Sequence, residues 1–433
     1  MGCKAHATDG PPDTLFCCPS RIGNTHKRPK PRFLRPLTNF EQIPEPRPEN
    51  RPTATALAHR LALGLHKAGL FFSFTFLLEN HMTHDSSGLI GNIAVPDPSL
   101  ATRIQGLLDN KTKPQGSLGR LEALAVQIGQ ALGAEAPHLT QPQMLVCAAD
   151  HGIAAHGVSP FPVDVTWQMV RNFLAGGAAV SVLARQHGVA LTVADCGVRQ
   201  PFEDAPGLRQ MRIAAGTADS TQGPAMSLAQ CEQAIRNGRA LVQSLPGNVV
   251  LLGEMGIGNT SAASLLLARL TGRESGAALA ECVGRGSGLD DTGLQRKCET
   301  LARALAANAG ARAPLTALAA LGGFEIATLT GALLQAASER RVIVVDGFIT
   351  TAAALVACEL APNARPYCVF AHLSQERGHA LMLERLHAQA LLHLNLRLGE
   401  GSGALLAWPL LQSACAVLNE MATFESAQVC NRS

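Results

Sequence analysis

The residues best suited to chemistry lie within residues 248–268, where a short apolar run meets a glycine turn and then a helical pattern. A strand–turn–helix segment of this kind directs backbone N–H groups and the positive end of the helix dipole at one point, which suits a phosphate. Glycine lets the backbone approach a ligand closely, and short polar side chains add hydrogen bonds. The candidate phosphate-binding residues are Gly256, Ile257, Gly258, Asn259 and Thr260, and Glu254 before them could meet a polar part of the same ligand.

This glycine turn does not identify its ligand by itself. It lacks the third glycine of G-x-G-x-x-G and does not match G-x-x-x-x-G-K-[ST]. A glycine turn between a strand and a helix is otherwise an ordinary tight connection. On this motif alone, a phosphate site and a structural turn are both open.

A second candidate is a single carboxylate, Glu400, which is framed by Gly399, Gly401 and Gly403. Glycine neighbours are unusual on a solvated helix face, and they allow a substrate to approach the backbone. A carboxylate placed in this way is a candidate general base. The alternative is that Glu400 caps a helix starting near Ser402, and the sequence leaves both interpretations open.

A second glycine turn covers residues 284–291. Its Arg285 is available for an anion, and Gly286 and Gly288 could approach a ligand. Paired aspartates at a helix start, here Asp290 and Asp291, are more typical of capping than of catalysis or metal binding.

Two further loops have a chemical and a structural interpretation each. The loop at 157–162, with the helix containing Gln168, offers an apolar wall and one amide, which suit a flat aromatic ring. Packing by Phe161 and capping by Ser159 are the alternatives. The turn at 113–121 is expected to be a helix cap with solvated charges.

Five short apolar runs, each ending in small or polar residues, predict the elements that position these groups. They cover residues 144–148, 191–194, 249–252, 342–345 and 368–370. Continuous hydrophobicity is typical of strands buried on both faces, hence of a parallel α/β sheet flanked by helices. Ligands of such sheets lie beyond the carboxyl ends of the strands, where all five polar clusters fall. This agreement favours an active site over a set of ordinary turns.

Two segments outside the sheet, residues 98–134 and 379–424, are predicted to be mostly helical. Apolar faces are expected from Leu107, Leu118, Leu121, Leu124 and Ile128 in the first, and from Leu381, Leu383, Leu386, Leu405, Leu406, Leu410 and Leu411 in the second. Both fit one small helical domain built from the two ends of the folded region. The expected organisation is an N-terminal extension (1–93), a helical segment (94–136), a large α/β nucleotide-binding domain (137–378) and a C-terminal helical segment (379–433).

Composition limits the class of protein. With 47% hydrophobic and 16% charged residues, the chain is typical of a globular enzyme. Residues 1–81 hold 11 Lys+Arg and 6 Asp+Glu, so the remainder has 36 − 11 = 25 against 33 − 6 = 27. This mildly acidic body argues against nucleic-acid binding. The 12 cysteines form no C-x-x-C pair, which favours buried reduced thiols in a cytoplasmic protein over zinc or disulfides.

The first 81 residues differ from the rest. They contain 10 of the 25 prolines and several basic clusters, so a compact core there is not expected. The apolar run at 61–78 is interrupted by His66 and Lys67, and we interpret it as neither a membrane span nor a signal peptide. Met82 is a hypothetical natural start.

Seven motifs together resemble one enzyme family, nicotinate-nucleotide–dimethylbenzimidazole phosphoribosyltransferase. In order they are KPQGSLGRLE at 113–122, ADHG at 149–152, GEMGIGNT at 253–260, GRGSGLDD at 284–291, VDGF at 345–348, AHLS at 371–374 with ERGH at 376–379, and RLGEGSG at 397–403. The resemblance covers about residues 94–424 and no part of residues 1–81.

The resemblance implies a specific reaction: transfer of the 5-phosphoribosyl group from nicotinate mononucleotide to 5,6-dimethylbenzimidazole with inversion at the anomeric carbon. It implies a homodimer with a Rossmann-like sheet and no metal requirement. We expect no other cofactor and no nucleic-acid or membrane partner. Matched by position, Glu400 is the general base, and Glu254 aids placement of the ribose or leaving group. The phosphate is matched to 256–260 with Gly286 and Gly288 nearby, and the acceptor base to Ser159, Gln168 and Leu398. Ser287 replaces an expected Thr and keeps its hydroxyl.

Two alternatives stay open. A family member could act on another base, such as adenine, a phenol or a different benzimidazole. A non-catalytic nucleotide-binding protein could use the same fold, although such a relative would be expected to lose Glu400 or Glu254.

Overall fold

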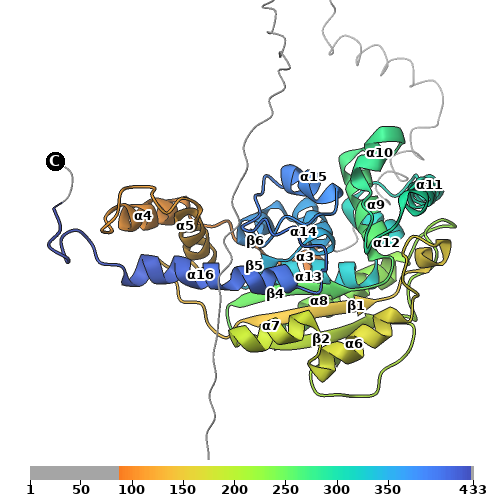
Figure 1. Ribbon diagram of the computed structural model, residues 1–433, viewed down its shortest axis with the longest axis horizontal. Coiled ribbons are helices and arrows are strands. Elements are labelled where there is room, and N and C mark those ends of the chain that lie inside the picture. The colour runs from red at the N-terminus through yellow and green to blue at the C-terminus, as the bar shows by residue number, and fades with distance from the viewer. Residues whose placement is uncertain (1–86, 431–433) are drawn as a thin grey trace, which may run out of the picture. The chain divides into compact units, whose positions relative to one another are not determined.

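The computed structural model describes residues 87–430, and its core is a six-stranded parallel sheet (Figure 1). The strand order is β3-β2-β1-β4-β5-β6. The strands are β1 (Gln143–Ala149), β2 (Ala190–Gly197), β3 (Leu208–Gln210), β4 (Val249–Met255), β5 (Val342–Val345) and β6 (Cys368–Phe370). The order reverses direction between β1 and β4, and such a switch point opens a ligand crevice at the carboxyl ends.

The α/β class and all five predicted strands are confirmed. The structure adds β3, which sequence reasoning missed because it is three residues long and buries only Leu208. In the register of the sheet, Cys147 of β1 lies between Ala194 of β2 and Glu254 of β4. Glu254 is therefore delivered to the carboxyl edge at the centre of the sheet.

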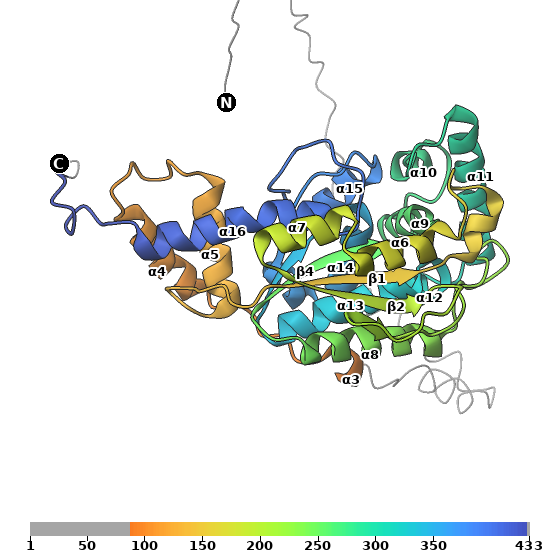
Figure 2. The ribbon, with the colours of Figure 1, turned by 60° about the horizontal axis from the view of Figure 1, so that its bottom comes forward.

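Helices cover both faces of the sheet (Figure 2). On one face lies α13 (Phe324–Ser338), almost entirely buried because α8 (Leu228–Ser244) packs on its outer side. On the other lie α6 (Val165–Ala175), α7 (Ala179–His187) and α16 (Ser402–Glu420). The remaining elements around the sheet are η1 (Gly152–His156), α9 (Asn259–Thr271), α10 (Gly276–Cys282), α11 (Asp291–Ala307), α12 (Pro314–Leu321), α14 (Phe348–Leu360), η2 (Pro362–Tyr367) and α15 (Gly378–Arg385).

Two helices near the start of the described chain pack with its last helix: α5 (Arg120–Leu132) contacts both α4 (Pro98–Asp109) and α16. Asp97 caps α4 by accepting the Ser99 N–H at 2.8 Å. Among residues 87–430, no helix has the length and apolar character needed to cross a membrane.

The structure corrects details of the helical predictions. Leu107 and Leu118, expected on the apolar face, are exposed. Residues 386–401 are irregular rather than helical, and this segment carries the Glu400 turn.

A buried ion pair replaces the solvated charges expected in the turn at 113–121. Lys113 Nζ lies 2.8 Å from Glu122 Oε1, and both side chains are buried. Glu122 also accepts the Leu118 N–H at 2.9 Å. The buried Glu122 carboxylate therefore stabilises the turn through both contacts. Sequence reasoning missed this because the charged residues of a turn normally face water.

The N-terminal extension was expected to reach residue 93, but its last residues are packed. The short helix α3 (Ser87–Ile90) contacts α8 and α13, and Leu89 and Ile93 are buried. The expectations for residues 1–81 and the hypothetical start at Met82 concern residues outside those that the structure describes.

Candidate active site

A cavity of about 320 Å³ lies beyond the carboxyl ends of β4, β5 and β6. It is bounded by the glycine turn after β4, the loop before α6 and the segment before α16. The predicted site residues that line it are Ser159, Glu254, Gly256, Ile257, Gly258, Asn259, Thr260, Gly286, Leu398 and Glu400. Residues separated by up to 241 positions in the sequence thus meet at one end of the sheet.

The predicted phosphate turn has the expected strand–turn–helix form. β4 ends at Met255, Gly258 adopts a left-handed conformation with φ of 99°, and α9 starts at Asn259. Space there is restricted, since a Cβ on Gly256 would lie 2.4 Å from the carbonyl oxygen of Ala149. The turn is also tied to α6, because the Ile257 N–H donates to Thr166 Oγ1 at 3.1 Å.

The carboxylate of Glu400 is held by an unusual backbone turn. Gly399, Glu400 and Gly401 all have positive φ, at 84°, 63° and 91°. A non-glycine residue with this conformation is uncommon and often marks a functional site. The turn lies against β4, where a Cβ on Gly253 would come within 2.3 Å of the Glu400 carbonyl oxygen.

The side chain of Glu400 does not cap α16. The backbone N–H of Val180, at the start of α7, acts on this carboxylate and lowers its pKa against the effect of burial. The side chain is buried, and Oε2 has no hydrogen-bond partner within the described part of the chain. Of the two interpretations left open by the sequence, the helix cap is therefore wrong for α16.

Asp346, at the end of β5, caps α16 in its place. Its carboxylate accepts the Gly401 N–H at 3.1 Å and the Ala404 N–H at 2.9 Å. Both bonds join the end of β5 to the chain that follows Glu400. Asp346 therefore anchors the C-terminal side of the Glu400 turn.

Four acidic groups line this cavity, and all four have raised pKa values. Burial raises the pKa of Glu376 against the charge of Lys297. The other three are Glu254, Asp346 and Glu400. Burial raises the pKa of Glu254 to about 8, with the charges of Asp346 and Glu325 adding to the rise. Burial raises the pKa of Asp346 to about 7, although the backbone N–H groups that donate to its carboxylate act to lower that pKa. Burial also raises the pKa of Glu400, and the charge of Asp346 adds to it. A ligand with a positive centre would stabilise the ionised forms of all three.

These carboxyl groups make the stability of the fold depend on pH. Because Glu254 and Asp346 bind a proton more tightly when folded, their stabilising effect is lost as pH rises through about 7 to 8. We expect Tm to fall by about 5 °C between pH 5.5 and pH 8, measured by calorimetry. Glu254→Gln should flatten this slope, and an equal slope in that variant would contradict the assignment. The lowered pKa of Lys297, about 8, has the opposite effect only at higher pH.

Sequence reasoning missed Lys297 of α11, which joins the two glycine turns. Its buried Nζ donates to Thr260 Oγ1 at 2.9 Å and to the Gly284 carbonyl at 3.2 Å. Burial lowers its pKa to about 8, and the charge of Glu376 opposes that fall. The available signal was its spacing, since four-residue steps place Lys297 on the apolar face with Leu301 and Leu305.

Comparisons with known proteins agree with this geometry. A family model described as Phosphoribosyltransferase matches residues 93–429. The protein named nicotinate-nucleotide–dimethylbenzimidazole phosphoribosyltransferase in Variovorax paradoxus is 64% identical over 346 residues, 80% of this chain and 98% of that protein. This chain belongs to the nicotinate-nucleotide–dimethylbenzimidazole phosphoribosyltransferase family.

Two further relatives of this phosphoribosyltransferase family extend the match. A protein of the same name from Cupriavidus necator is 56% identical and covers 77% of this chain and 96% of its own length. The crystal structure of the Thermus thermophilus protein superposes with a TM-score of 0.72 at 39% identity, covering 78% of this chain and all of that one. The resemblance inferred from the seven motifs is confirmed.

The structure of this family member leaves three predicted residues outside the cavity lining. Gln168 has an exposed side chain, with Met169 lining the cavity in its place. Gly288 is exposed, whereas its neighbour Ser287 lines the cavity. Arg285 pairs with Asp291 and donates to the Leu289 carbonyl, while the expected cap is confirmed by Asp290, which accepts the Gly293 N–H at 2.7 Å.

The expectation that all five strand-end clusters form the site is met only at β4, β5 and β6. At β2, Asp195 accepts the N–H groups of Gly197 and Val198, which is ordinary turn chemistry. At β1, His151 is buried under the glycine turn and lies 2.7 Å from Glu325 Oε1. Both clusters stabilise the carboxyl edge of the sheet, and neither lines the cavity.

His372 is one of several cavity-lining side chains that were not among the predicted site residues. His372 follows β6 and is buried, and neither ring nitrogen has a hydrogen-bond partner among residues 87–430. Its Nε2 lies 3.8 Å from Asp346 Oδ1. Burial lowers its pKa, so the imidazole is neutral and has hydrogen-bonding capacity for a ligand.

Proposed function

We propose that this chain transfers the 5-phosphoribosyl group from nicotinate mononucleotide to 5,6-dimethylbenzimidazole. The products are α-ribazole 5′-phosphate and nicotinate, and the reaction serves assembly of the lower ligand of cobalamin. The names of the relatives support this reaction. The observation that carries it is the buried Glu400 carboxylate, which lies in a left-handed turn and lines the same cavity as a phosphate-type glycine turn. Its Oε2 has no hydrogen-bond partner among residues 87–430.

In this proposal the 5′-phosphate binds the N–H groups at the start of α9, and Thr260 and Lys297 complete the site. The ribose C1 then lies among the carboxyl groups of Glu254 and Asp346. Nicotinate bound to C1 as a pyridinium leaves as a neutral ring, so little acid catalysis is needed. The carboxylates stabilise the oxocarbenium character that develops at C1.

Glu400 acts on the acceptor. Its carboxylate takes the proton from one benzimidazole nitrogen while the other nitrogen attacks C1 from the face opposite nicotinate, which gives inversion. Ser159, Phe161 and Leu398 line the cavity around the proposed base site. The pKa of Glu400 is raised toward neutral pH, which suits a general base.

An end-point assay with nicotinate mononucleotide and 5,6-dimethylbenzimidazole tests the reaction, with products resolved by chromatography and mass. A ribazole phosphate product is expected. Nicotinate release with adenine or a phenol, but not with dimethylbenzimidazole, would keep the family and change the acceptor. No release with any acceptor would overturn the proposal in favour of a non-catalytic nucleotide-binding protein.

We also propose a cytoplasmic homodimer, with a small helical domain formed by α4, α5 and α16. The packing of α5 on α4 and α16 supports the domain. The seven buried thiols among residues 87–430 support a reducing compartment. Light scattering on the eluting protein measures the oligomeric state, and a monomer mass at micromolar concentration would reject the dimer.

A further inference from the structure

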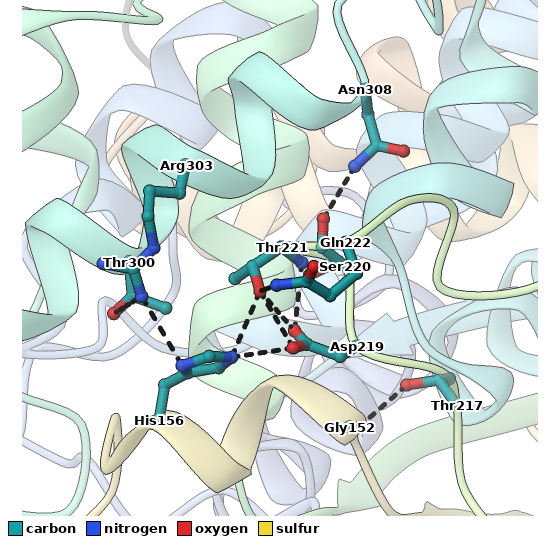
Figure 3. Close-up of polar contacts among 10 residues, drawn as sticks. All are labelled: Gly152, His156, Thr217, Asp219, Ser220, Thr221, Gln222, Thr300, Arg303 and Asn308. Carbon is teal, nitrogen blue, oxygen red and sulfur yellow. Dashed lines mark hydrogen bonds and ion pairs between the residues drawn. The ribbon is translucent and has the colours of Figure 1, made fainter.

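A second cluster of polar side chains lies outside the cavity, around His156 at the end of η1 (Figure 3). His156 Nε2 lies 2.7 Å from Asp219 Oδ2 and 3.1 Å from Thr221 Oγ1. Arg303 of α11 approaches the other ring nitrogen, Nδ1, at 3.5 Å. Because a guanidinium only donates, the ring carries its proton on Nε2 and gives it to Asp219.

This arrangement is not a nucleophilic triad. In such a triad the carboxylate and the hydroxyl contact opposite ring nitrogens. Here Asp219 and Thr221 share Nε2, and the Thr221 hydroxyl also lies 2.8 Å from the Asp219 carboxylate. The cluster is therefore suited to holding His156 in place.

The loop that holds His156 is itself anchored to the core. The Thr217 N–H donates to the Asp150 carbonyl after β1 at 3.0 Å. Asn308 at the end of α11 donates to the Ser220 carbonyl at 2.8 Å. The Ala225 N–H donates to the Ala320 carbonyl of α12 at 3.0 Å. Residues 217–225 thus form a fixed support.

η1 is attached to this support at both ends. At its start, the Gly152 N–H donates to Thr217 Oγ1 at 3.1 Å, and a Cβ on Gly152 would come within 2.5 Å of the Ala218 backbone. At its end, the attachment is the His156 side chain. Removing that side chain leaves η1 held by this support only at Gly152.

The segment that follows His156 forms one wall of the cavity. Val158, Ser159 and Phe161 line the cavity, and Phe161 is 48% exposed. The Phe161 N–H donates to Ser159 Oγ, a local bond that ties the wall to no other element. The next attachment to the site is Thr166, which accepts the Ile257 N–H. Within this segment Val158 is buried, and Asp164 accepts the Gln200 side-chain amide at 3.4 Å. The polar contacts that hold the exposed part of the wall therefore lie at its two ends, at His156 and at Asp164 with Thr166.

We propose that His156 is a positioning residue: through Asp219 and Thr221 it fixes the wall of residues 157–161 against which the acceptor base binds. The inference rests on the proposed function for the identity of that base. The phosphate turn has supports of its own, namely the Thr166–Ile257 bond and the bond from Asn259 to Glu254. Loss of His156 is therefore expected to affect the acceptor base more than nicotinate mononucleotide.

Steady-state kinetics of His156→Ala tests the proposal with each substrate varied in turn. We expect KM for dimethylbenzimidazole to rise at least tenfold, with KM for nicotinate mononucleotide and kcat each within threefold of the wild type. His156→Gln, whose amide can still donate to Asp219, should restore most of the affinity. His138→Ala, at an exposed histidine before β1, is the matched control and should behave as the wild type.

Hydrogen exchange followed by mass spectrometry gives a readout that does not need activity. Peptides covering residues 157–165 should exchange faster in His156→Ala, while peptides of α13 should not change. Unchanged KM for the base, or unchanged exchange in 157–165, overturns the proposal.

These measurements distinguish failure of the proposed function from failure of the proposed role of His156. A wild type without transferase activity removes the proposed function, and the exchange result alone then decides the role of His156. Should His156→Ala not fold, Thr221→Val removes only one contact to the ring and is expected to raise KM for the base about threefold. A Thr221→Val protein with wild-type KM and exchange counts against the proposal.

Discussion

Replacing Glu400 by Gln is expected to lower kcat at least 100-fold, within the roughly 10²–10⁴-fold range of general-base catalysis. Gln keeps the size of the side chain and can still accept a hydrogen bond, but it cannot take a proton from the acceptor base. KM for both substrates should change little, because the turn and the Asp346 bonds to it are retained. Initial rates of ribazole phosphate formation at saturating substrates measure the effect.

The matched control for this variant is Glu420→Gln. Glu420 is exposed at the far end of α16, the helix that follows the Glu400 turn, so it undergoes the same chemical change without touching the cavity. It should retain wild-type activity. A Glu400→Gln enzyme with more than a third of wild-type turnover would show that another group accepts the proton.

The second large effect is expected from Gly256→Ala, in the phosphate turn. The added Cβ would lie 2.4 Å from the Ala149 carbonyl oxygen and 3.3 Å from the His151 ring, so the backbone must move. That movement misdirects the N–H groups at the start of α9. We expect kcat/KM for nicotinate mononucleotide to fall about 100-fold, in line with the cost of misplacing a substrate by about 1 Å.

Comparison of two donors shows whether this loss concerns the phosphate. The wild type should prefer nicotinate mononucleotide over the nucleoside that lacks the phosphate, and Gly256→Ala should lose most of that preference. Gly310→Ala adds the same methyl group in an exposed turn with no atom within 4 Å and should have no effect. An unchanged preference in Gly256→Ala would place the phosphate elsewhere.

Several parts of this molecule could be predicted from local sequence patterns. The continuous apolar runs specified five buried parallel strands, because a strand covered on both faces has no polar side to alternate with. Glycines around Glu400 and after β4 marked turns with positive φ, which few other residues adopt. The order of seven motifs indicated the family before any tertiary contact was known.

Other parts could not be predicted, because they depend on which elements meet. Lys113 and Glu122 are charged residues in a turn, and only the packing of the surrounding chain removes them from water. Lys297 is a lysine within a helix, and its bond to Thr260 depends on α11 lying against the start of α9. Strand β3 forms because β2 offers it an edge, since its own three residues carry little signal.

The sequence by itself determined the α/β class, the phosphate-type turn, the isolated Glu400 carboxylate and the family. Each of these features depends on a short segment of the chain, because it follows from the backbone preferences or the hydrophobic pattern of that segment alone. The tertiary structure alone decided which strand ends line the cavity and how strongly burial raises the pKa of Glu254. It also decided that His156 is held by Asp219. Those properties depend on the strand order and on desolvation by segments far apart in the chain, which no local pattern records.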